Sequence, residues 1–126
     1  MLGAADLVAF VASRDLEVSD RFYGGVLGFE LVESSAFANA YDVNGSQLRV
    51  TRVQELVPAP YTVLGWSVGD IVGTIRVLRE AGVAFKHYEG MTQDEHAVWL
   101  SPGGARVAWF ADPDGNTLSL QQAPLV

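Results

Sequence analysis

The sequence predicts an α+β fold made of two βαβββ modules, whose strands form a mixed, curved sheet around a cavity. The main observation is an internal repeat. Two aspartates that suit helix N-caps, Asp15 and Asp70, lie 55 residues apart, and two glycines that suit helix ends, Gly28 and Gly82, lie 54 apart. Each half also ends in two strand-like segments joined by a turn sequence. We therefore expect one domain over residues 1–126, with modules over about 5–53 and 61–122.

The first module is expected to begin with an apolar strand over residues 7–12, followed by a helix from Asp15 to Gly28. A second strand is expected over 29–33. The module then closes with a hairpin, because Asn44-Gly45 is the strongest short hairpin signal and joins apolar segments over 36–43 and 47–51.

The second module repeats this order, with a strand over 62–68, a helix from Asp70 to Gly82 and a strand over 83–88. Its closing hairpin is expected over 107–111 and 117–121, around Asp114-Gly115. An insertion over 89–105 separates the two parts and is rich in glycine, proline and charge around one apolar stretch, 97–100. Loops of this length are usually functional or mobile.

Composition excludes several classes of partner. Fifteen acidic against 8 basic residues give a net charge of −7, so nucleic acid is not an expected partner. No apolar run approaches the roughly 20 residues of a membrane span, and no membrane is expected. The chain has no cysteine, which excludes thiolate sites and disulfides and is compatible with the cytoplasmic location that we expect.

Two motifs in this order resemble the vicinal oxygen chelate superfamily, which contains glyoxalase I, extradiol dioxygenases and bleomycin-binding resistance proteins. The first motif is Asp15-Leu16-Glu17, Phe22-Tyr23 and Leu27-Gly28-Phe29, and the second runs from Phe110 to Asn116. The resemblance covers nearly the whole chain. It implies the two-module fold and a homodimer, which exposed sheet edges also favour, but fold alone does not determine chemistry.

The resemblance also implies four metal-ligand positions, at the start of the first strand and the middle of the last strand of each module. In this sequence they map to Leu7 (or Val8), Arg49, Val63 and Ser119. A divalent metal needs imidazole, carboxylate or thiolate donors, and a guanidinium repels it. We therefore predict no metal at this position and no cofactor.

Strand alternation predicts which side chains line the cavity instead. They are Gln47, Arg49 and Thr51, then Val63, Gly65 and Ser67, then Thr117, Ser119 and Gln121. A cation in such a place needs a partner. For Arg49 this is either an anionic ligand, gripped in bidentate fashion, or an internal carboxylate of Asp42 or Glu33.

Aromatic side chains are further candidates, since rings beside a few polar groups suit a flat ligand. They are Trp99, Trp109, Tyr41, Phe37 and Tyr88, and the alternative is that they form sheet core. His87 and His96 match no zinc spacing and are interpreted as loop residues.

The sequence therefore favours a small-molecule-binding protein without a metal. The alternatives left open are an enzyme of glyoxalase type (lyase or isomerase) or dioxygenase type that works without the usual ligands, and a member with only an assembly role. The predicted ligand-binding residues are Arg49, Gln47, Thr51, Ser67, Trp99, Trp109, Tyr41, Ser119 and Gln121.

Overall fold

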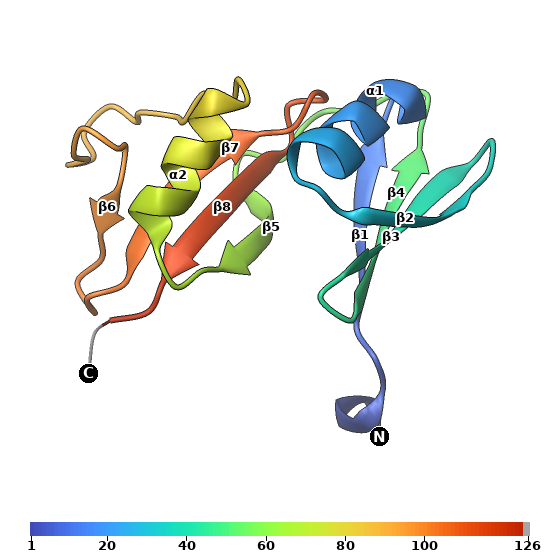
Figure 1. Cartoon of the computed structure of the whole chain (residues 1–126), viewed down its shortest axis with the longest axis horizontal. Coiled ribbons are helices and arrows are strands. Elements are labelled where there is room, and N and C mark those ends of the chain that lie inside the picture. The colour runs from blue at the N-terminus through green and yellow to red at the C-terminus, as the bar shows by residue number, and fades with distance from the viewer. Residues whose placement is uncertain (125–126) are drawn as a thin grey trace. The chain divides into compact units, whose positions relative to one another are not determined.

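The computed structural model describes residues 1–124 and divides into two compact units, Met1–Pro58 and Ala59–Val126. Each unit contains one four-stranded mixed sheet and one main helical segment (Figure 1). The α+β class and the two repeated modules are thereby confirmed.

The first unit orders its strands β1-β4-β3-β2. The first strand of the module runs parallel to the last strand of the hairpin. The other two pairs of neighbouring strands are antiparallel. The elements are a short 3-10 turn η1 (Leu2–Ala4) and the strands β1 (Val8–Ser13), β2 (Glu30–Ser34), β3 (Ala38–Val43) and β4 (Ser46–Arg52).

The helix of this unit begins as predicted at Asp15, whose carboxylate accepts hydrogen bonds from the backbone N–H groups of Glu17 and Val18. It runs as α1 (Leu16–Asp20) and then widens into a π-helical segment, η2 (Arg21–Val26). Gly28, with φ of 77°, ends it in the left-handed conformation that favours glycine. Only the π-helical half differs from the expected regular helix.

Tyr41 corrects one prediction of a ligand-binding residue. Asn44 and Gly45 have φ of 49° and 89°, which makes a two-residue hairpin turn and pairs Tyr41 with the buried Leu48. Directly paired side chains share one face of the sheet, so Tyr41 lies on the helix side. It is 0% exposed, and its hydroxyl donates a 2.7 Å hydrogen bond to Oδ1 of Asp20. Tyr41 is therefore a core residue.

Tyr41→Phe is expected to lower the free energy of unfolding by about 1 kcal/mol at pH 8, because the O–H that donates to Asp20 is lost. Burial, and next the hydrogen bond to Asp20 and its charge, raise the pKa of Tyr41. A raised folded-state pKa gives stability that is present below about pH 10, the pKa of an unfolded tyrosine, and lost above it. The stability difference between wild type and variant in urea titrations should therefore shrink from pH 8 to 11. A constant difference would contradict this account.

The second unit orders its strands β5-β8-β7-β6, the same pattern as in the first unit. Helix α2 (Ile71–Glu80) is capped by Asp70, which accepts from the backbone N–H of Gly73, and Gly82 follows with φ of 95°. The strands are β5 (Thr62–Ser67), β6 (Trp99–Leu100), β7 (Arg106–Ala111) and β8 (Thr117–Gln122).

The predicted strand over 83–88 is wrong. Only Phe85 pairs there, in an isolated antiparallel bridge with Phe110, and the backbone N–H of Lys86 donates to the carbonyl of Trp109. The remaining edge of β7 is occupied by β6, which pairs Trp99 with Val107. The apolar stretch of the insertion thus supplies the fourth strand of this sheet.

One face of the second sheet packs against α2 and forms the core of the unit. The core residues have the alternation expected of strands and the helical spacing expected of α2. Buried core residues are Ile71, Ile75, Leu78, Phe85, Ala108, Phe110, Leu118 and Leu120. Among the described residues, no helix has the length and apolar character needed to cross a membrane.

Candidate functional site

The face of the second sheet opposite its helix, here called the open face, carries most of the predicted polar residues. Pairing places Trp109 beside Ser119 and Gly65 beside Ser119, so the three share this face. A Cβ atom at Gly65 would come within 2.8 Å of the Ser119 hydroxyl, which explains why glycine stands there. Ser67 and Gln121, also predicted, are paired with one another and exposed.

Three aromatic rings gather on this open face, and we call them the aromatic cluster: Tyr88, Trp99 and Trp109. The ring centroids of Trp99 and Trp109 lie 6.1 Å apart, and Tyr88 meets Trp109 edge-on at 5.5 Å. The rings come from three separate segments of the chain. Of the two predicted tryptophans, Trp109 pairs with Ser119 and Trp99 pairs with Val107. Burial raises the pKa of Tyr88, so its hydroxyl stays protonated at neutral pH.

Lys86 is a residue of this face that the sequence analysis missed. It is the only lysine of the chain and is half-buried. Its ammonium donates a 3.2 Å hydrogen bond to the hydroxyl of Thr117, and within residues 1–124 it has no ion pair. Alternation from Phe85, which faces the core, could have placed Lys86 on the open side.

Gln93 holds the segments that carry the aromatic cluster. Its side-chain carbonyl accepts from the backbone N–H of Tyr88 at 2.8 Å. Its amide nitrogen donates to the backbone carbonyls of Lys86 at 2.9 Å and Ala97 at 2.8 Å. One carboxamide therefore joins residues 86–88 to the segment just before β6.

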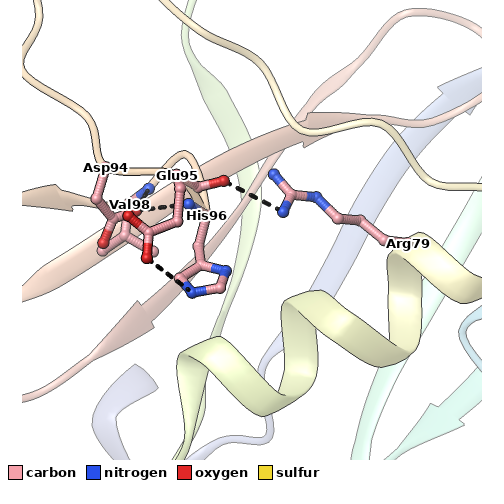
Figure 2. Close-up of polar contacts among 5 residues, drawn as sticks. All are labelled: Arg79, Asp94, Glu95, His96 and Val98. Atoms are coloured by element: carbon pink, nitrogen blue, oxygen red, sulfur yellow. Dashed lines mark hydrogen bonds and ion pairs between the residues drawn. The ribbon is translucent and has the colours of Figure 1, made fainter.

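The insertion is also closed by a tight turn, shown in Figure 2. Oδ1 of Asp94 accepts from the backbone N–H groups of His96 and Val98, at 2.8 and 3.0 Å. Figure 2 also shows the backbone carbonyl of Glu95 accepting from Arg79 of α2 at 3.4 Å. His96 lies 3.6 Å from the Glu95 carboxylate. The turn is structural, and in the described part of the chain no three His, Cys, Asp or Glu side chains form a metal cluster.

The first sheet presents a different open face. Arg49 pairs with Phe10 on β1 and Ala40 on β3, and Gln47 and Thr51 lie on the same side, as predicted. Phe10 is 64% exposed and Arg49 is half-buried. Among residues 1–124, Arg49 forms no ion pair with Asp42, Glu33 or any other carboxylate, so the structure does not show the internal partner considered above.

Comparison with protein families gives a match over residues 6–120, to the Glyoxalase/Bleomycin resistance protein/Dioxygenase superfamily. The chain belongs to this superfamily. A search of curated proteins gives no match.

Several solved structures share the fold of the chain. The bleomycin resistance determinant encoded on transposon Tn5 has a TM-score of 0.71 and 23% identity, covering 97% of this chain and 100% of the other. A lactoylglutathione lyase from Agrobacterium tumefaciens has a TM-score of 0.72 and 19% identity, covering 94% of this chain and 93% of the other. An integron cassette protein from the mobile metagenome of the Halifax Harbour sewage outfall has a TM-score of 0.70 and 24% identity, covering 94% of this chain and 98% of the other. At these identities the likeness establishes the fold alone.

The superfamily's metal-ligand positions can now be placed within each unit. Val8 begins β1 and Arg49 lies in the middle of β4, while Val63 lies early in β5 and Ser119 in the middle of β8. Leu7, the alternative residue for the first metal-ligand position, lies just before β1 and is exposed. None of these side chains offers an imidazole, a carboxylate or a thiolate. The donor set therefore does not fit a divalent metal.

The structure also has shallow hollows away from these faces. One of about 400 Å³ lies beside the insertion and is lined by Val72, Gln93, Asp94 and Leu100 among others. Another of about 340 Å³ lies in the first unit, beside Arg14 and Arg52. Asp15 and Glu17 line the second hollow as well, so its charges largely cancel and it offers little selectivity for an anion.

Proposed function

We propose that this superfamily member binds a small molecule and does so without a metal ion. The single observation that carries the proposal is the set of side chains at the four metal-ligand positions, because two aliphatic groups, one hydroxyl and one guanidinium cannot hold a divalent cation. The open faces support binding, since they combine half-buried and exposed aromatic rings with a few polar and cationic groups. The proposed contacts in the first unit are Arg49, Gln47 and Thr51, and those in the second unit are Ser67, Trp99, Trp109, Ser119 and Gln121.

Metal analysis tests the metal-free part of the proposal. Protein purified without chelator is expected to carry well under one equivalent of zinc, nickel, manganese or iron by mass spectrometry. Neither EDTA nor added metal should change its melting temperature, because a ligand raises it only when it binds the folded state. A stoichiometric metal that disappears in Ser119→Ala would contradict the proposal.

A thermal-shift screen of neutral, anionic and cationic aromatic compounds tests the binding part. A compound at 100 times its dissociation constant stabilises the folded state by about 2.7 kcal/mol, which corresponds to several degrees. A screen in which no compound shifts the melting temperature would favour an assembly role. Turnover of a compound that binds would favour the metal-independent enzyme.

We also propose a homodimer in the cytoplasm. Strand β2 is the outer strand of the first sheet, and all five of its residues are exposed, so its outer backbone groups are free to pair with a second copy. Light scattering after size exclusion should then give twice the chain mass of 13.6 kDa. A monomer at micromolar concentration would contradict it.

A further inference from the structure

We propose that the ligand of the second unit is a planar aromatic acid, whose anionic group binds the ammonium of Lys86 and whose ring packs against the aromatic cluster. This inference rests on the proposed function and adds the chemical class of the ligand. It depends on three features of the open face: an ammonium with free donors, the absence of carboxylates beside it, and adjacent rings.

The ammonium of Lys86 has hydrogen-bonding capacity to spare. A lysine ammonium carries three N–H donors, and the hydroxyl of Thr117 takes one of them. Within the described chain no carboxylate lies within ion-pair distance, and no aromatic ring lies beneath this cation. A half-buried cation with one neutral partner favours an incoming anion, since burial strengthens the attraction between opposite charges.

The charge around Lys86 is unusual for this chain. The whole sequence has a net charge of −7, yet no strand position on this open face is acidic. These positions, assigned by pairing and alternation, are Val63, Gly65, Ser67, Trp99, Val107, Trp109, Ala111, Thr117, Ser119 and Gln121. No acidic side chain at these positions offsets the charge of Lys86, so the surroundings of its ammonium favour an anion over a cation.

The aromatic cluster supplies the second half of the recognition. The backbone N–H of Lys86 donates to the carbonyl of Trp109, which places the two residues side by side. The Trp109 ring in turn contacts the rings of Tyr88 and Trp99. Thr117, which binds the ammonium, pairs with Ala111, two residues along β7 from Trp109. An anion at the ammonium would therefore place an attached ring nearest to Trp109 of the aromatic cluster. Aromatic pairs prefer offset-stacked or edge-on contacts and contribute beyond their buried area.

Three probes with one ring system test the charge preference by calorimetry: indole-3-acetate, indole-3-acetamide and tryptamine. We expect the acid to bind at least about tenfold more tightly than the amide, the scale of one charge-assisted hydrogen bond, and tryptamine to bind most weakly. Lys86→Met should remove the preference for the acid, and Lys86→Arg should retain most of it. Arg76→Met, which removes an exposed cation from α2, is the matched control and should change nothing.

Trp99→Leu should weaken the binding of the acid and of the amide by similar factors, because both compounds contain the indole ring. Circular dichroism establishes that each variant is folded. Equal affinity for acid and amide, tighter binding of tryptamine, an unaltered preference in folded Lys86→Met, or no binding of the acid would overturn this inference. Tight binding of the amide or the amine would contradict this inference but not the proposed metal-free binding function. That function would instead be contradicted by a stoichiometric metal, or by a wider screen in which no compound binds.

Discussion

Phe110→Ala is expected to lower the free energy of unfolding of the second unit by about 3–5 kcal/mol, the largest effect of any single change considered. Phe110 is 0% exposed. Its ring centroid lies 5.3 Å from that of Phe85 and 6.2 Å from that of Trp66, so truncation removes contacts that link β7 to β5 and to residue 85. Urea unfolding followed by far-ultraviolet circular dichroism measures the loss.

Val77→Ala is the matched control for this change. Val77 lies on α2 of the same unit but is 65% exposed, so its truncation should stay within about 0.5 kcal/mol of wild type. A loss below about 1 kcal/mol in Phe110→Ala would show that the helix-facing core is packed differently.

Gln93→Ala is expected to lower the free energy of unfolding by about 2 kcal/mol and to abolish most of the affinity for the aromatic acid. The substitution leaves three backbone groups without their partner, at Lys86, Tyr88 and Ala97. Each lost bond costs up to about 1 kcal/mol where water replaces it in part. Because Lys86 and Tyr88 carry the ammonium and one ring, and Ala97 lies two residues before Trp99, hydrogen exchange should increase at residues 86–88 and 97–99.

Thr92→Ala is the control for the insertion, since Thr92 is exposed and its side chain makes no hydrogen bond within residues 1–124. It should leave stability and affinity unchanged. A folded Gln93→Ala with wild-type affinity would mean that the aromatic cluster keeps its geometry without this carboxamide.

Local signals in the sequence predicted most of the framework correctly. Both helix caps, Asp15 and Asp70, are where their side chains can accept backbone N–H groups, and Gly28 and Gly82 have the positive φ expected at helix ends. These features depend on a few neighbouring residues, so the sequence alone suffices. The face of Tyr41 follows from a local signal as well, because the Asn44-Gly45 turn determines its pairing with Leu48.

The edge of the second sheet could not be predicted from local signals. Residues 83–88 have strand-forming side chains, yet only Phe85 pairs, and Trp99–Leu100 occupies the remaining edge of β7. Which of two segments pairs with an edge depends on contacts between distant parts of the chain, such as the bond from the backbone N–H of Lys86 to the carbonyl of Trp109. Alternation from Phe85 places Lys86 on the open face, but its partner Thr117, 31 residues away, could not be predicted from local signals.

The alternation along β7 and β8 has a consequence for how such a protein can change over evolutionary time. Residues that hold the sheet to α2, such as Phe110 and Leu118, alternate with open-face residues such as Trp109 and Ser119. Mutations on the outward set leave the packing of the sheet against α2 in place. A lineage built on this framework can exchange one specificity for another in small steps, without passing through unfolded ancestors.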